Sequence, residues 1–280
     1  MNIDQLYKEI KPLIILALKE DIGNGDITSC AIFQRRDIST AIIYAKEDSI
    51  FCGGEVVNCV YNEIDPNLKI SIQIKDGSLI SKDEMAIEID GNTKSILMGE
   101  RLALNFIGRM SGIATKVHRV CKTLEGTDVK LFDTRKTLPG FRLLDKYSVK
   151  MGGGHNHRLG LYDMVMIKDN HIKAAGSIQE AVNRVRAAHG NKYKIEVESK
   201  TLMEVEEAVE SGVDVIMLDN MNPELMQRSI ELIDGRSKIE ISGNIDEVKI
   251  RKIRNLKIDY ISMGALTHSV RSMDYSMKFL

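Results

Sequence analysis

Residues 194–219 read KIEVESKTLMEVEEAVESGVDVIMLD, which is the pattern of one β-α-β unit. The apolar runs KIEVE (194–198) and VDVIMLD (213–219) have the length of buried strands. Between them, TLMEVEEAVESG (201–212) spaces its apolar residues as a helix does and ends in glycine. Strands joined by a helix normally lie parallel in one sheet, so this stretch predicts a parallel α/β fold.

The same rhythm continues through the second half of the chain. The further strand candidates are VKLFD (129–133), MVMIK (164–168), KIEIS (238–242) and DYISMG (259–264). SIQEAVNRVRAAHG (177–190) has helical spacing, and Asn222-Pro223-Glu224 is typical of a helix start. Six strands joined in this way form either a doubly wound sheet or a barrel.

The residues that follow the strands favour the barrel. Each strand candidate ends in, or leads into, a charged, polar or glycine-rich group: Asp133-Thr134-Arg135-Lys136, Lys168, Glu198, Asp219-Asn220, Ser242-Gly243-Asn244 and Met263-Gly264-Ala265. In a β/α barrel the loops after all strands surround one site, whereas a doubly wound sheet uses fewer of them. We therefore predict an α/β barrel of about six strands over residues 111–269.

The first part of the chain has a different pattern. Residues 4–20 have helical spacing, and TAIIYAKED (40–48), LKISIQIK (68–75) and MAIEID (85–90) are strand candidates. Residues 94–124 favour either one helix or two helices that break near Ser111-Gly112. This mixture predicts an N-terminal α+β domain of the open-sandwich type over residues 1–110.

Composition excludes several classes of protein. The 280 residues carry a net charge of −1, so no overall charge favours nucleic acid or a membrane surface. The N-terminal MNIDQLYKEIKPL lacks the apolar core of a signal peptide, and no apolar run is long enough to span a bilayer. The cysteines, at 30, 52, 59 and 121, are scattered without a metal-binding spacing. We interpret them as reduced residues of a cytoplasmic protein.

The rim residues divide by chemistry. Arg135, Lys136, Arg158 and Lys168 are cations of the kind that bind carboxylates. The glycine loops SGN (242–244) and SMGALTHS (262–269) follow the last two strands, where barrels usually bind phosphate. Glu198 and Asp219 lie between these groups in the sequence, and they are suited to holding magnesium or stabilising a developing positive charge.

Less specific interpretations compete with this one. The sequence DTRKT fits a solvated turn, and Glu198 and Asp219 fit the caps of the following helices. His155 and His157 in MGGGHNHR (151–158) have a spacing known from zinc sites, with Lys168 as a bridging group. Against a hydrolytic metal, this pair follows a glycine loop and is adjacent to Arg158, which would repel a cation.

DTRKTLPGFRLLDKYSVKMGGGHNHRLGLYDMVMIKDNH (133–171) strongly resembles the signature region of the quinolinate phosphoribosyltransferase family. LKEDIGNGDITS, GERLALNFIGRMSGIAT (99–115), KIEVES, IMLDN, ISGNI and SMGALTHS follow in the family's order, so the similarity covers essentially the whole chain. A molybdenum-operon group of phosphoribosyltransferase-like proteins has similar motifs, but the intact GGGHNHRLGLYDMVMIKDNH is closer to the quinolinate enzymes.

The resemblance implies a fold and an activity. The fold is a TIM-like incomplete barrel, with the tail 270–280 rejoining the N-terminal domain. The reaction is the formation of nicotinate mononucleotide, pyrophosphate and carbon dioxide from quinolinate and phosphoribosyl pyrophosphate, in de novo NAD biosynthesis. The family resemblance further implies Mg²⁺ as cofactor and a homodimer or higher oligomer. A related transferase for another aromatic acid and a non-catalytic sensor of phosphoribosyl pyrophosphate remain as alternatives.

The resemblance also assigns roles to residues. Arg135, His157, Arg158 and Lys168 would hold the two carboxylates of quinolinate, and Lys136 would lie between quinolinate and the pyrophosphate. Glu198 and Asp219 would face the ribose and its magnesium, directly or indirectly. Ser242-Gly243-Asn244 and Gly264-Ala265-Leu266 would bind the 5′-phosphate. Arg101 would reach the site of a neighbouring subunit. Asn244 stands where many relatives carry glycine, and asparagine tolerates the positive φ expected there.

Overall fold

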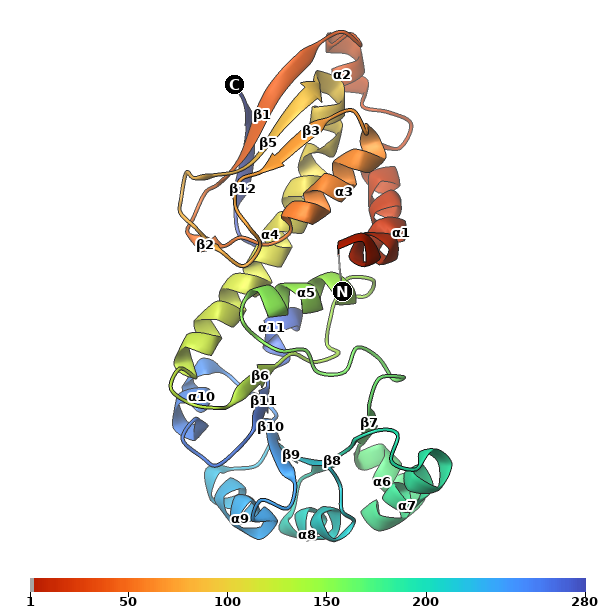
Figure 1. The fold of residues 1–280 in the computed structure, drawn as a ribbon, viewed down its shortest axis with the longest axis vertical. Coiled ribbons are helices and arrows are strands. Elements are labelled where there is room, and N and C mark those ends of the chain that lie inside the picture. Colours follow the sequence, from red (N-terminus) through yellow and green to blue (C-terminus); the bar gives the residue numbers. More distant parts are fainter. Residues whose placement is uncertain (1–2) are drawn as a thin grey trace. The chain divides into compact units, whose positions relative to one another are not determined.

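The computed structural model describes residues 3–280, which separate into two compact units (Figure 1). The first unit consists of the chain up to Arg119 together with Thr137–Gly153 and Ser269–Leu280. The second consists of Val120–Lys136 and Gly154–His268. The domain limits expected from the sequence stay a prediction, and residues 110 and 111 both lie inside the helix α4 (Thr93–Thr123).

An antiparallel sheet of four strands forms the centre of the first unit. Its order is β12-β1-β5-β3, with β1 at Ile38–Ala45, β3 at Lys69–Ile72, β5 at Met85–Asn92 and β12 at Tyr275–Phe279. Alternate residues of β1 are buried, as expected for a sheet that is covered on one face. The chain's final strand therefore pairs with β1, antiparallel to it.

The buried face of this sheet packs against the helices α3 (Gly54–Ile64) and α4. One apolar cluster joins Ala41 and Ile43 of β1 with Tyr61 of α3 and Ile107 of α4. A second cluster joins α1 (Ile3–Ile22) and α5 (Arg142–Met151) to the same two helices. The sheet with helices on one face confirms the expected open sandwich.

Helix α4 is continuous, so the break considered at Ser111-Gly112 is wrong. The glycines of this helix serve a close approach of the backbone instead. A Cβ atom at Gly108 would lie 2.9 Å from the carbonyl oxygen of Met273, and one at Gly112 would collide with that of Arg271. The segment that leads into β12 therefore crosses α4 at a distance that only glycine permits. The remaining elements of this unit are short: α2 (Ile27–Ile32) and the pair β2 (Ser49–Ile50) and β4 (Leu79–Ile80).

The second unit is built on six parallel strands. They are β6 (Lys130–Phe132), β7 (Val165–Ile167), β8 (Ile195–Ser199), β9 (Val215–Asp219), β10 (Lys238–Ser242) and β11 (Tyr260–Ser262). The sheet order β6-β11-β10-β9-β8-β7 keeps consecutive strands adjacent and returns the first strand to the last. This is the order of a barrel, and it excludes the doubly wound sheet, whose order reverses near its middle.

The barrel is incomplete between β6 and β7. Within residues 3–280 these two strands are not paired with each other, and β6 instead forms a single parallel bridge from Phe132 to His155. Backbone bonds run from His155 N to Leu131 O, at 2.8 Å, and from Asp133 N to His155 O, at 3.1 Å. The segment HNH (155–157) thus covers the edge of β6 where a complete barrel would have another strand.

The helices of the second unit begin where their capping residues predict. Ser177, Thr201, Asn222 and Asp246 each accept a backbone N–H in the first turn of the helix that follows. These helices are α7 (Ile178–His189), α8 (Leu202–Glu210), α9 (Pro223–Ile233) and α10 (Glu247–Ile253). Two shorter helices, α6 (Asp169–Ala175) and α11 (Ala265–His268), follow β7 and β11 directly.

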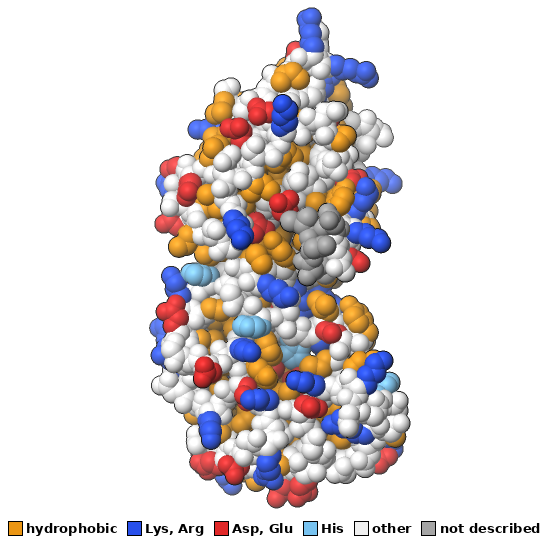
Figure 2. All heavy atoms as spheres, viewed as in Figure 1, with side chains coloured by type: hydrophobic (Ala, Val, Ile, Leu, Met, Phe, Trp, Pro, Cys, Tyr) orange, Lys and Arg blue, Asp and Glu red, His pale blue; other side chains and the backbone are white. Residues whose placement is uncertain are grey.

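The surface agrees with the balanced composition. On the face drawn in Figure 2, acidic and basic side chains of the described residues are interspersed over both halves of the chain. None of the described helices has the length and apolar character that crossing a membrane requires.

Candidate active site

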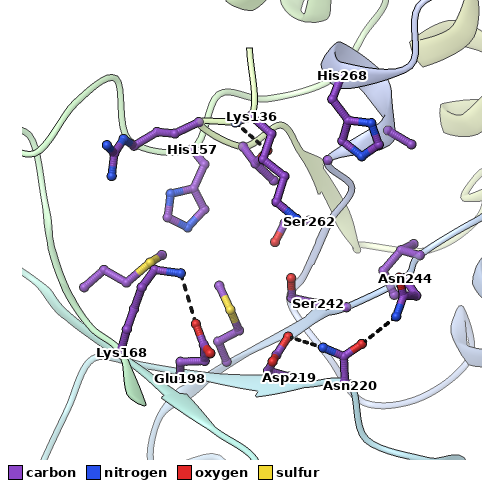
Figure 3. Close-up of a pocket in the computed structure, with 18 of the residues that line it drawn as sticks. Lys136, His157, Lys168, Glu198, Asp219, Asn220, Ser242, Asn244, Ser262 and His268 are labelled. Atoms are coloured by element: carbon purple, nitrogen blue, oxygen red, sulfur yellow. Dashed lines mark hydrogen bonds and ion pairs between the residues drawn. The ribbon is translucent and has the colours of Figure 1, made fainter. Parts of the chain in front are cut away.

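A cavity of about 720 Å³ lies at the carboxyl ends of the six parallel strands (Figure 3). All of the sequence-predicted site residues line it except Arg101 and Leu266. Arg101 is exposed on α4 in the first unit, and the Leu266 side chain is fully buried in the second. The structure therefore confirms that the ends of the six strands converge on one cavity.

The segment after α5 begins with glycines of the first unit and continues into the second unit. A Cβ atom at Gly152 would lie 2.6 Å from the side chain of Val117, and Gly153 has a φ of 93°. Neither position accommodates an ordinary side chain without strain. Beyond them, the N–H of His157 donates to Oδ1 of the fully buried Asp133 at 2.8 Å. The bond to Asp133 thus holds His157, and Arg158 next to it, against the end of β6.

Two guanidinium groups lie close together on this side of the cavity. The Arg158 residue is 8% exposed, and its Nη1 donates to the carbonyl of Met164 at 3.4 Å. Burial, and secondly the charge of Arg135, lowers the pKa of Arg158. Within the described residues, the buried Nε of Arg135 has no hydrogen-bond partner. Two like charges and a free donor favour an anion as the missing partner.

The acidic groups face the cations across the cavity floor. In Figure 3 the side chains of Lys168 and Glu198 point toward each other, and Nζ lies 3.0 Å from Oε2. Lys200 lies 3.5 Å from the other oxygen of Glu198. On the next strand, Asp219 Oδ1 accepts from Asn220 Nδ2 at 3.0 Å. The two carboxylates end neighbouring strands, β8 and β9, as the sequence predicted.

The loop after β10 is held in a conformation that suits an anion. Gly243 has a φ of 93°, and a Cβ atom there would lie 2.6 Å from the backbone nitrogen of Asn220. Asn244 has a φ of 48°, so the positive value expected for it is confirmed. Its Nδ2 donates to Asn220 Oδ1 at 3.0 Å. Lys249 Nζ donates to the carbonyl of Gly243 at 2.9 Å, which adds a cation beside the loop.

The loop after β11 lies beside Lys136. A Cβ atom at Gly264 would be 3.1 Å from the Lys136 side chain, and Thr267 Oγ1 donates to the Lys136 carbonyl at 2.8 Å. The backbone N–H groups of residues 266–268 are already used within the turn, in bonds to Met263 and Gly264. Lys136 therefore lies between the cation side of the cavity and its glycine loops.

Sequence reasoning missed several residues of the site. Met166 and Met217 also line the cavity, as do Asn220, Ser262 and His268, which lie in segments that the sequence analysis named without giving these residues a role. The most consequential omissions are Glu196 and Glu240, which lie in the barrel interior and contact His157. The sequence did contain a signal for them. Each glutamate lies inside a strand candidate, two positions before the rim residue Glu198 or Ser242, so its side chain lies on the same face of the strand as that rim residue.

Comparison with known proteins identifies the family. The model of the N-terminal domain of quinolinate phosphoribosyl transferase matches residues 26–111, and that of the C-terminal domain matches residues 113–278. The chain belongs to the quinolinate phosphoribosyltransferase family. It is 42% identical, over 97% of its length and 93% of the relative's, to the probable nicotinate-nucleotide pyrophosphorylase (carboxylating) of Bacillus subtilis.

Solved structures of the family have the same architecture. NadC from Streptococcus pyogenes is 43% identical, with a TM-score of 0.93 over 97% of both chains. The nicotinate-nucleotide pyrophosphorylase from Francisella tularensis is 38% identical, with a TM-score of 0.93 over 98% of this chain and 97% of that one. The expected family and fold class are therefore confirmed.

Proposed function

We propose that the protein is a quinolinate phosphoribosyltransferase of de novo NAD biosynthesis. It transfers the phosphoribosyl group of phosphoribosyl pyrophosphate to the ring nitrogen of quinolinate, and it releases pyrophosphate and carbon dioxide with nicotinate mononucleotide. The observation that carries this proposal is the single cavity that joins a cluster of cations, two carboxylates and two glycine loops, in a chain of this family.

The cation side of the cavity binds the two carboxylates of quinolinate. Arg135 and Arg158 repel each other in the free protein, and a dicarboxylate relieves that repulsion while it satisfies the Arg135 Nε. Lys168 reaches the same side when it exchanges Glu198 for a substrate carboxylate. His157 forms the wall behind these groups, with only 7% of its side chain exposed.

The glycine loops bind the 5′-phosphate of the ribosyl donor. Ser242-Gly243-Asn244 and Gly264-Ala265-Leu266 follow the last two strands, where barrels most often hold phosphate. Asn244 and Ser242 supply polar side chains, and Lys249 supplies positive charge next to the first loop. Leu266 contributes only to the shape of the second loop, since its side chain is buried and its N–H donates to the Met263 carbonyl.

The first chemical step replaces one bond at the anomeric carbon by another. The bond from C1′ to the pyrophosphate oxygen breaks as the pyridine nitrogen forms its bond to C1′. Positive charge develops on the ribose ring in between, and Glu198 and Asp219 stabilise it. Lys136, placed between the two parts of the cavity, stabilises the negative charge that develops on the departing pyrophosphate.

The second step is the loss of carbon dioxide. Ribosylation makes the ring a pyridinium, and its cationic nitrogen stabilises the carbanion left when the adjacent carboxylate departs. The carbanion then takes a proton from water, so no enzymic base is required. The role of Arg135 and Arg158 in this step is to orient the carboxylate without holding it so strongly that carbon dioxide cannot leave.

Mg²⁺ is the proposed cofactor, and the donor set fits it. Glu198 and Asp219 offer carboxylate oxygens, which this ion prefers, at the rim of the cavity. Lys168 and Lys200 already neutralise much of the charge of Glu198, so Asp219 is the freer of the two donors. When bound, the ion would supply positive charge for the phosphates of the donor substrate.

We further propose a homodimer in the cytoplasm. Arg101 is an exposed cation on α4, and in the dimer it would complete the cation cluster of the neighbouring subunit. Variant Arg101→Ala should then lose activity that is restored by mixing with a catalytically inactive Glu198→Ala chain. The free thiols of all four cysteines agree with a reducing compartment.

The function is tested by assay of the purified protein with quinolinate, phosphoribosyl pyrophosphate and Mg²⁺. Carbon dioxide and nicotinate mononucleotide should form in equal amounts. Turnover of another aromatic acid but not of quinolinate would identify a related transferase. Tight binding of phosphoribosyl pyrophosphate without any turnover would identify a sensor.

A further inference from the structure

Two glutamates lie in the barrel interior below the cavity floor. Glu196 on β8 and Glu240 on β10 are each 1% exposed, and β9 separates their strands. A buried carboxylate is costly unless it is paired and hydrogen-bonded, so each needs a specific partner. In the proposed function, neither glutamate binds the substrate carboxylates, the ribose or the phosphates.

The partner that both glutamates share is His157. Its Nε2 lies 3.0 Å from Glu196 Oε2 and 3.5 Å from Glu240 Oε2. Ser262 on β11 in turn donates to Glu240 Oε1. Three strands of the barrel therefore converge, through side chains, on one nitrogen of one imidazole ring.

The other ring nitrogen faces the next residue of the chain. The backbone N–H of Arg158 donates to His157 Nδ1 at 2.7 Å. Burial lowers the pKa of His157, but the hydrogen bonds and charges of the two glutamates outweigh it and raise that pKa to about 10. The Arg158 N–H favours the neutral ring instead. In both forms Nε2 carries a proton and donates it to the carboxylates.

These contacts fix a segment that the sheet alone leaves weakly held. HNH (155–157) pairs with β6 at a single bridge, on the side where the barrel is open. We propose that Glu196 and Glu240 are positioning residues that act through His157 to hold Arg158 in place for the carboxylates of quinolinate. This inference rests on the proposed function of the same cavity.

A metal ion is the competing occupant of this cluster, since one donor atom each of His157, Glu196 and Glu240 lie within 4.8 Å of one another. The hydrogen bonds of His157 argue against it. Its Nδ1 accepts the Arg158 N–H, so its Nε2 carries the proton that faces the carboxylates and offers no lone pair to a metal ion. The Arg158 guanidinium also places positive charge beside Glu196, which opposes a second cation there.

The test uses variants that keep shape but remove charge, Glu196→Gln and Glu240→Gln. Each should raise the KM for quinolinate about tenfold, the value of one charge-assisted hydrogen bond, and leave the KM for phosphoribosyl pyrophosphate within about twofold. In a His157→Asn background, Glu240→Gln should change the quinolinate KM by less than about twofold, because the group it acts through is already gone.

Asp259→Asn is the matched control. The carboxylate of Asp259 accepts from Ile239 N at 2.9 Å and from Lys238 Nζ at 2.7 Å, at the amino end of the same sheet. Its loss should lower thermal stability without changing the quinolinate KM. The proposal would be overturned by an equal rise of the quinolinate KM in Asp259→Asn. It would also be overturned if Glu240→Gln raised the quinolinate KM about tenfold both in the wild-type protein and in the His157→Asn background. If the wild-type protein does not use quinolinate at all, that result alone contradicts the proposed function, independently of the variants.

Discussion

The interiors of the two units are built from different side chains. Behind the antiparallel sheet of the first unit, the core is a continuous apolar cluster that includes Ile43, Ile87 and Ile107. The parallel barrel of the second unit instead has Glu196, Glu240 and Arg158 inside it. Apolar burial stabilises a fold directly, whereas buried charge costs stability unless every group is paired. The barrel interior therefore loses stability in return for a site, whereas the apolar cluster behind the antiparallel sheet does not. The buried Asp145 of the first unit lies outside that cluster, on α5, and is paired with Arg109.

This contrast also explains how the two units use glycine. In the first unit, Gly112 lets a backbone segment pack on α4, which serves the core. In the second, Gly243 forms the turn at the rim of the cavity, which serves the site. Variants of the barrel should thus change kinetics more than stability, and variants of the sandwich should do the opposite.

The largest expected effect is that of Glu198→Ala on kcat. Removal of a carboxylate that stabilises the developing positive charge should lower kcat about 100- to 1000-fold, with smaller changes in both KM values. Steady-state kinetics with both substrates varied measures this. Glu206→Ala, an exposed glutamate of the following helix, is the control and should behave as wild type. A defect confined to KM would remove Glu198 from its transition-state role.

Arg135→Ala should have the next largest effect. The loss of a guanidinium that binds a substrate carboxylate should raise the quinolinate KM about 30- to 100-fold and leave the thermal unfolding midpoint nearly unchanged. Arg184→Ala, which removes an exposed arginine from an ion pair on α7, provides the comparison. Unchanged kinetics in Arg135→Ala would show that the cation cluster has been assigned wrongly.

Gly112→Val tests the apolar unit. The added side chain collides with the Arg271 carbonyl, and overpacking of this kind should cost about 2 kcal/mol in the free energy of unfolding. Urea unfolding measures the loss, and Asn105→Val on the exposed side of the same helix corrects for the helix propensity of valine. Equal stability of the two variants would mean that the backbone of residue 271 does not pack closely on α4.

The smallest expected effect is on the pH dependence of the free energy of unfolding, and it comes from Glu196 in the barrel. Burial and the charge of Glu240 raise the pKa of Glu196 to about 7, above that of an unfolded chain. The folded state then binds more protons than the unfolded state, so this contribution to stability is full at low pH and is lost as pH rises toward 7. In Glu196→Gln, the fall in unfolding free energy from pH 6 to pH 7 should be smaller than in wild type by about 1 kcal/mol. An identical pH dependence would contradict the raised pKa.

Much of the fold followed from local signals in the sequence. The alternation of strands and helices, the helix start at Asn222, the glycines at 190 and 212, and the groups that end the strands together predicted the barrel and its cavity. These signals are local because helix ends and strand faces are decided by residues a few positions apart.

What could not be predicted depended on distant contacts. Gly112 suggested a helix break because the sequence does not show that residue 271 crosses the helix there. Glu196 and Glu240 looked like ordinary strand residues because their partner, His157, lies on another segment. The helices α3 and α5 were missed for the same reason, since apolar contacts with α1 and α4 stabilise them.

The central claim is that the charged interior of the barrel supports a site for an aromatic dicarboxylate. The most direct measurement is the ratio of kcat/KM for quinolinate to kcat/KM for nicotinate, with phosphoribosyl pyrophosphate and Mg²⁺ saturating. Nicotinate lacks the second carboxylate, so we predict that quinolinate is preferred by at least about 100-fold, the value of one paired charge. Equal use of the two acids, or a preference for nicotinate, would contradict the account.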